Sequence, residues 1–175
     1  MVAWASTSSS SILVASEPPA VRILRQRRIA HELHHFPSSI RTAEDAANAL
    51  GVAPSAVYKT LVVSTDAPGD KPLLVMLPGP KDLDPRQLAR MLGFKRLRMA
   101  GKADAERATG MRTGGISAIP LAGRGFKVFL DREALARETI YVSAGEPGAD
   151  VSLSVHDLVE LTGATLVDIY PRSSR

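Results

Sequence analysis

The segment VYKTLVVST at residues 57–65 decides the fold class, because β-branched and aromatic residues dominate it as they do in β-strands. Residues 72–77 have the same character, and the turn-forming stretch 66–71 joins the two segments. The sequence therefore predicts two paired strands. Alternation places Lys59 and Leu61 on one face of the first strand. Lys59 then either reaches solvent from an edge strand or points into a pocket, where a lysine can bind a carboxylate or phosphate.

Short elements surround this strand pair, and many are bounded by capping residues, proline or glycine. Helices are expected at residues 20–28, 43–50, 85–92, 103–109 and 155–161. Further strands are expected at residues 126–130, 140–143, 151–153 and 164–170. Residues 29–36 fit either a helix or a strand. Because strands and helices mix without strict alternation, the sequence predicts a single compact α+β domain. We expect a flexible extension at 1–17, the domain at 18–170 and a tail at 171–175.

Composition excludes several classes of function. The 175 residues are 45% hydrophobic and 23% charged, which is typical of a soluble globular domain. The absence of cysteine excludes a disulfide scaffold, a thiol nucleophile and cysteine-based metal sites. No apolar run approaches the roughly 18–20 residues needed to span a bilayer, and no secretory signal is recognisable. A cytoplasmic location without membrane attachment is therefore expected.

The positive charge is concentrated rather than spread. The chain carries a formal charge of +4, yet residues 81–112 alone hold nine basic and four acidic side chains. Such clusters attract polyanions with little sequence preference, although a merely solvated basic face is an equal alternative. The candidate polyanion-binding residues are Lys95, Arg96, Arg98, Lys102, Arg25 and Arg28.

The motif HELHH at residues 31–35 matches the zinc-protease pattern H-E-x-x-H. That pattern binds metal only on a helix, where both histidines share one face, and Pro37 leaves little room for a helix. His156 could supply a third ligand. The alternative is a strand with partly exposed histidines, so a zinc hydrolase is only a remote alternative and no metal site is expected.

A glycine-rich loop follows at residues 113–117, with the sequence TGGIS. Consecutive glycines let main-chain amides approach a ligand and hold an oxyanion, although such pairs are more often simple turns. Ser143 and Asp150 flank a second glycine-containing turn. No Ser-His-Asp triad can be assembled from the sequence, because a triad is defined by geometry.

As a set, these motifs resemble the YbaK/EbsC family of aminoacyl-tRNA deacylases, relatives of the editing domain of bacterial prolyl-tRNA synthetases. The resemblance extends over residues 18–170. The matching segments are residues 19–22, 53–63, 83–84, 91–93, 107–110, 114–117, 140–143 and 161–164.

The resemblance implies an α+β domain with a mixed, largely closed sheet and hydrolysis of the ester that joins a wrong amino acid to tRNA. Cys-tRNA(Pro), or a similar small amino acid on tRNA, is the implied substrate. Prolyl-tRNA synthetase is a candidate partner, and no cofactor is implied. By the resemblance, Lys59 is the hallmark functional residue, and the residues lining the aminoacyl cleft are Thr60, Gly114, Gly115, Ile116, Ser117, Ser143 and Asp150.

The loop after Ser117 departs from the family pattern G-G-I-S-P-L-G, because here Ala118 and Ile119 precede Pro120. The amino acid that is removed therefore stays open, as does the oligomeric state.

We expect Lys59 to anchor the tRNA terminal phosphate or ribose, and amides around Gly115 to stabilise the developing oxyanion. Water, or a substrate thiol, would attack the ester. A non-catalytic tRNA- or synthetase-binding module of the same fold is the alternative.

Overall fold

The computed structural model describes residues 16–37, 39–40, 42–67 and 69–170. Five short helices lie in this part of the chain: α1 (Pro19–Gln26), α2 (Ala43–Leu50), α3 (Pro85–Leu92), α4 (Lys102–Thr109) and α5 (Val155–Thr162). The strands are β1 (His31–His35), β2 (Val57–Thr65), β3 (Leu73–Pro78), β4 (Leu97–Met99), β5 (Val128–Asp131), β6 (Thr139–Glu146), β7 (Ala149–Ser154) and β8 (Thr165–Val167). Residues 1–15 and the expected tail at 171–175 lie outside the described residues.

Local capping explains where the helices begin and end. The Thr42 hydroxyl accepts a hydrogen bond from Asp45 N, and the Asp45 carboxylate accepts one from Thr42 N, which completes the expected capping box of α2. The side chains of Asp84 and Ser154 also accept main-chain N–H hydrogen bonds at the starts of α3 and α5, without the reciprocal bond. Helices α2 to α5 each end at a glycine whose φ lies between 64° and 73°, a left-handed conformation that glycine adopts without steric cost.

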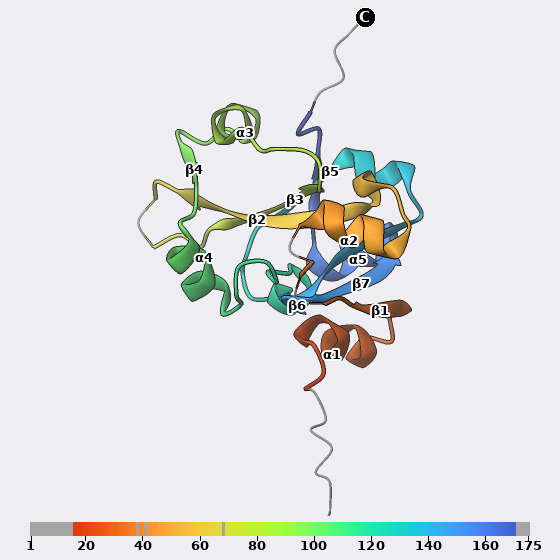
Figure 1. Ribbon diagram of the computed structural model, residues 1–175. Helices are drawn as coiled ribbons and strands as arrows, with labels where there is room; N and C mark the ends of the chain where they lie inside the picture. Colours follow the sequence, from red (N-terminus) through yellow and green to blue (C-terminus); the bar gives the residue numbers. More distant parts are fainter. Residues whose placement is uncertain (1–15, 38, 41, 68, 171–175) are drawn as a thin grey trace, which may run out of the picture.

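The strands form one mixed, eight-stranded sheet in the order β1-β7-β6-β2-β3-β5-β8, with β4 paired to β2 (Figure 1). This confirms the α+β expectation and the pairing of residues 57–65 with the following strand. The expectation of a largely closed sheet is wrong, because among the described residues β1 pairs only with β7 and β8 only with β5. Helices α1 and α5 and the 3-10 turn Ile119–Leu121 instead pack against one side of the open sheet.

Apolar side chains cover both faces of this sheet. One core contains Tyr58 and Val62 of β2 and is covered by α1, α5 and the turn at 119–121. The opposite core contains Val63 and is covered by α3. A third, smaller cluster joins Ala46 and Ala47 of α2 to the start of β2. Strand β2 therefore contributes side chains to all three clusters and lies in the centre of the fold.

Strand β2 changes partners along one of its edges. Its first residues pair with β6 in parallel, and its last residues pair with β4 in antiparallel fashion. The sequence did not predict β4, because three residues are too few for a periodic pattern. The change of partner leaves the middle of β2 open on that edge, where the candidate site lies.

Candidate active site

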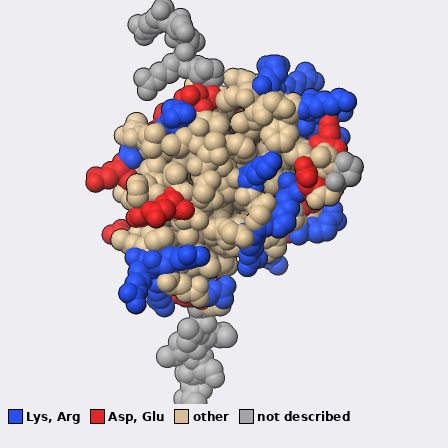
Figure 2. Space-filling view, turned by 180° about the vertical axis from the view of Figure 1, so that it is seen from behind, with Lys and Arg blue, Asp and Glu red and all other residues tan. Residues whose placement is uncertain are grey.

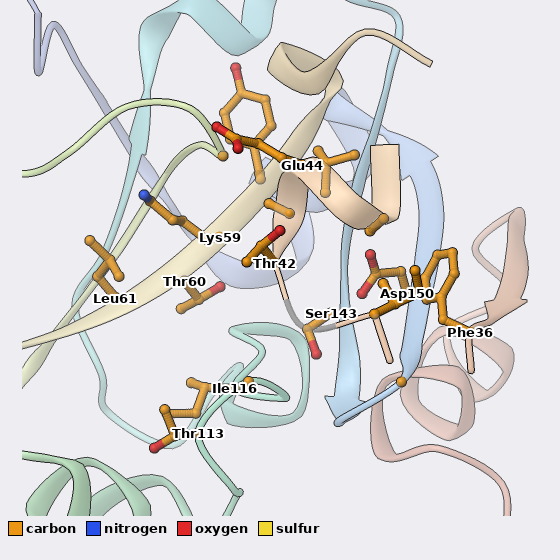
Figure 3. Close-up of a pocket in the computed structure, with 18 residues that line it drawn as sticks. Phe36, Thr42, Glu44, Lys59, Thr60, Leu61, Thr113, Ile116, Ser143 and Asp150 are labelled. Carbon is orange, nitrogen blue, oxygen red and sulfur yellow. The ribbon is translucent and has the colours of Figure 1, made fainter. Parts of the chain in front are cut away.

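A cavity of about 470 Å³ lies beside the middle of β2 (Figure 3). Helix α2, strand β2, the glycine-rich loop and the β6–β7 hairpin all contribute to its wall. The volume is in the range of small-ligand sites. The lining residues that the sequence predicted are Lys59, Thr60, Gly114, Ile116, Ser143 and Asp150.

Helix α2 and the segment that precedes it supply a part of the wall that the sequence did not predict. Phe36, Ile40 and Ala43 form an apolar side of the cavity, and Thr42 and Glu44 lie at its polar side. A Cβ at Gly79 would lie 2.5 Å from the Ala43 Cβ, so α2 approaches the end of β3 this closely only because residue 79 is glycine. Nothing in the local pattern distinguishes this glycine from an ordinary turn residue.

Lys59 is the cation of the cavity. Its side chain is 29% exposed, and its Nζ lies 3.5 Å from Oδ1 of Asp82. Asp82 is fully exposed, so this ion pair is screened by water and contributes little stability. The Tyr170 hydroxyl donates a hydrogen bond to the Asp82 main-chain oxygen and so holds that loop. An incoming anion can therefore replace Asp82 at Lys59 at small energetic cost.

Two carboxylates line the cavity: Glu44 is exposed, whereas Asp150 is half-buried and lies away from Lys59 in Figure 3. Asp150 faces Ser143 across the β6–β7 pair and His34 across the β1–β7 pair. Burial raises the pKa of the Asp150 carboxyl to about 6. Among the described residues no side chain forms an ion pair or hydrogen bond with it. A cationic group that entered the cavity would therefore satisfy this carboxylate.

The glycine-rich loop is divided between the cavity and the core. Gly114 and Ile116 line the cavity, whereas Gly115 and Ser117 are buried behind it. The Gly115 N–H donates a hydrogen bond to the Arg112 oxygen at 2.9 Å, and the Ser117 hydroxyl accepts one from Ile119 N. The Gly115 N–H is thus engaged within its own turn.

Glu106, which does not line the cavity, holds the glycine-rich loop in position. Its carboxylate accepts a hydrogen bond from Thr113 N at 2.9 Å, and this bond lowers the pKa of the Glu106 carboxyl. The residues that depart from the family pattern, Ala118 and Ile119, are fully buried in the core rather than in the cavity wall.

Gly115→Ala should destabilise the protein by about 3 kcal/mol, because the new Cβ would lie 2.4 Å from main-chain atoms of Glu146 and Pro147. Chemical denaturation of both proteins measures this difference. Gly101→Ala is the matched control: its Cβ would meet nothing closer than 3.7 Å, and we expect a change within about 1 kcal/mol. Equal stability of the two variants would contradict the packing that we describe.

The H-E-x-x-H motif lies on strand β1, which corrects the zinc-hydrolase alternative. Residues four apart on a strand are separated by roughly 13 Å, too far for His31 and His35 to share an ion. His34 instead contacts the Ser152 hydroxyl at 3.1 Å. His156 lies on α5 beside Asp157 and Glu160, an exposed local cluster that includes no residue of the motif.

The candidate tRNA-binding residues are all exposed. Arg25 pairs with Glu17 and Arg98 with Asp66, both at the surface. In the view of Figure 2, Lys and Arg side chains gather along the right-hand edge, the side of α3, β4 and α4, and separately at the lower left, where α1 lies. The predicted residues thus form two basic regions rather than one.

The fold and the cavity define a class of protein: an α+β domain with a ligand-sized cavity beside a strand lysine. The chain belongs to the aminoacyl-tRNA editing domain family, whose model matches residues 37–161. It is 31% identical over 152 residues to the Enterococcus faecalis protein named "Putative Cys-tRNA(Pro)/Cys-tRNA(Cys) deacylase EbsC", covering 86% of this chain and 91% of that protein.

Further relatives agree with this membership. A proline–tRNA ligase of Thermoanaerobacter is 27% identical over 113 residues, which are 63% of this chain and 19% of the ligase. A solved structure described as a "putative trans-editing enzyme for prolyl tRNA synthetase" superposes with a TM-score of 0.73 at 26% identity, covering 88% of this chain and 98% of that one. No helix in the described residues combines the length and apolar character needed to cross a bilayer.

Proposed function

We propose that this protein is a trans-acting deacylase that hydrolyses the ester of a small amino acid wrongly attached to tRNA, with cysteine on tRNA(Pro) as the first candidate. The observation that carries the proposal is the pairing of groups in one cavity: a cation, Lys59, and a half-buried carboxylate, Asp150, that no described side chain neutralises. The end of an aminoacyl-tRNA has the complementary charges.

The proposed orientation follows from those charges. Lys59 binds the terminal phosphate or ribose of the tRNA, where Asp82 now lies. Asp150 binds the α-ammonium group of the amino acid, which supplies the positive charge that the carboxylate lacks. The amino acid side chain then lies against the apolar wall near Ile116 and Phe36. A cavity of about 470 Å³ is in the range of small-ligand sites and can hold such a group.

The reaction needs no protein nucleophile, because an aminoacyl ester is already activated. Water attacks the ester carbonyl, a carbon–oxygen bond forms, the bond to the ribose oxygen breaks, and that oxygen takes up a proton. When the amino acid is cysteine, its own thiol can attack instead. The protein contributes position and electrostatic stabilisation, which together account for large rate effects in other enzymes.

Purified protein incubated with Cys-tRNA(Pro), Ala-tRNA(Pro) and Pro-tRNA(Pro) tests the proposal directly. We expect release of cysteine or alanine and retention of proline. Binding of tRNA without release from any substrate would contradict catalysis and support the non-catalytic binding module. The similarity to prolyl-tRNA synthetase and its trans-editing relative makes tRNA(Pro) the first choice, and we propose that the protein acts in the cytoplasm beside that synthetase.

Lys95→Gln combined with Arg96→Gln should weaken tRNA binding and lower the slope of log affinity against log salt by about 2, because each phosphate contact contributes close to 1. Binding titrations at several salt concentrations measure the slope. Arg132→Gln is the control, since Arg132 is a surface cation paired with Asp168 outside both basic regions. An unchanged slope in the double variant would exclude this region as the tRNA surface.

A further inference from the structure

The interior of strand β2 has an uncovered main-chain edge. On one side, β3 pairs with every residue from Tyr58 to Val63. On the other side, pairing with β6 ends at Tyr58 and pairing with β4 begins at Val63. Within the described part of the chain, no strand pairs with Lys59, Thr60 or Leu61 on this side, although the stretch lies in the middle of the sheet.

Two hydrogen bonds show which groups face the gap. The Val57 oxygen accepts a bond from Gly79 N at 2.8 Å, so odd-numbered residues of β2 direct their main-chain polar groups toward β3. The Val62 oxygen accepts a bond from Ala100 N at 2.9 Å, so even-numbered residues point toward the opposite edge. Thr60 lies between Tyr58 and Val62, and both its N–H and its C=O therefore face the gap.

The side chain of Thr60 adds a third polar group. Its hydroxyl is buried and makes no hydrogen bond with any described residue, and Thr60 lines the cavity (Figure 3). Main-chain groups in protein interiors are nearly always paired with protein, water or ligand. A strand edge that is left open beside a ligand-sized cavity therefore indicates that the ligand provides the missing pair.

We propose that the aminoacyl group of the substrate fills this gap as a strand of one residue paired with Thr60. Its ammonium group donates to the Thr60 C=O, and its ester carbonyl oxygen accepts from the Thr60 N–H, as two residues do in a hydrogen-bonded antiparallel pair. This inference rests on the proposed deacylase function and names the residue that recognises the aminoacyl backbone.

The pairing also assigns a catalytic role to the Thr60 amide. As water attacks the carbonyl carbon, negative charge develops on the oxygen that the Thr60 N–H contacts, and a fixed amide donor stabilises that charge. The oxyanion then collapses, the bond to the ribose oxygen breaks and that oxygen is protonated. The Gly115 amide cannot do this, because it is bonded to Arg112. Main-chain pairing identifies the substrate as an amino acid, while the apolar cavity wall near Ile116 selects its size.

Amide hydrogen exchange measured by NMR tests the geometry. In the free protein, the Thr60 N–H should exchange at least about 100-fold faster than the Leu61 N–H, which faces β3. Adenosine carrying alanine or cysteine on a 3′-amide, a stable analogue of the substrate, should slow exchange at Thr60 at least about tenfold and leave Leu61 unchanged.

Equal protection of Thr60 and Leu61 in the free protein would overturn the inference. So would an analogue that shifts the Lys59 and Asp150 resonances without slowing exchange at Thr60, an outcome that leaves the proposed function intact. An analogue that shifts no cavity resonance would overturn the proposed function and this inference together.

A main-chain substitution tests the catalytic role. Replacing Thr60 with the α-hydroxy acid of threonine exchanges its N–H for an ester oxygen while keeping the side chain, and kcat should fall by about 100-fold with the fold retained. The same replacement at Thr65, on the same strand but outside the cavity, is the matched control and should leave kcat unchanged. Equal kcat in both variants would overturn the assignment.

Discussion

Lys59→Ala is expected to lower the rate of deacylation at least about 100-fold while leaving the fold unchanged. The effect is large because Lys59 is the cation among the described lining residues that holds the tRNA end in place, and loss of a fixed charge near the reacting atoms has effects of this size. Single-turnover deacylation of mischarged tRNA measures the rate. Circular dichroism and thermal unfolding check the fold, which should persist because the only ion pair recorded for Lys59 is the exposed one with Asp82.

Lys127→Ala provides the comparison for this variant, since it removes a lysine from the surface beside Phe94, outside the cavity. We expect its rate to equal that of the unaltered protein. Activity of Lys59→Ala within about threefold of the unaltered protein would exclude Lys59 from the site.

Asp150→Asn should have the second-largest effect, because it removes the charge that binds the substrate ammonium. The raised pKa of about 6 gives a pH dependence with a definite sign. The carboxylate form binds substrate, so on the acidic side kcat/KM should be halved near pH 6 and fall about tenfold for each further unit of acidification. In Asp150→Asn, kcat/KM should be low at every pH and lack this limb.

As the pH rises and Asp150 loses its proton, the free energy of unfolding should fall, whereas kcat/KM should rise. A carboxyl whose pKa is about 6 when folded and 3.8 in its unperturbed state binds its proton more tightly in the folded protein. The free energy of unfolding should therefore fall between pH 4 and pH 6, by up to roughly 3 kcal/mol, and stay constant above pH 6. Asp150→Asn avoids this cost and should be more stable than the unaltered protein at pH 7.

Asp70→Asn is the control, since Asp70 is exposed and lies outside the cavity. It should leave both the pH profile and the stability unchanged. An acidic limb near pH 6 that persists in Asp150→Asn would mean that another group controls activity.

Local sequence determined the elements that depend on neighbours in the chain. Thr42, Asp84 and Ser154 predicted helix starts, and the glycines that follow α2, α3 and α4 predicted helix ends, because capping involves residues only a few positions apart. The pairing of β2 with β3 was predictable for the same reason, since a short turn connects them. The resemblance of the motifs to one family was confirmed by the match over residues 37–161.

Contacts between distant segments could not be predicted in this way. The loop TGGIS reads as a single ligand-binding motif, yet packing against the β6–β7 turn buries Gly115 and Ser117 and leaves Gly114 and Ile116 in the cavity. The histidine motif fits a helix by spacing, yet pairing with β7 extends it as a strand. The place of helix α2 in the site depends on its close packing against Gly79, which only the tertiary structure shows.

The sequence by itself therefore determined the α+β class, the helix boundaries, the family and the presence of Lys59 on a strand, because these depend on local spacing and on residue type. Only the tertiary structure decided that the sheet stays open, that the partner of β2 changes from β6 to β4, and that Lys59, Thr60 and Asp150 meet at one cavity. The physical reason is that strand pairing and burial join segments more than a hundred residues apart, as β1 and β7 show, and no local pattern records which edge of a strand will be left without a partner.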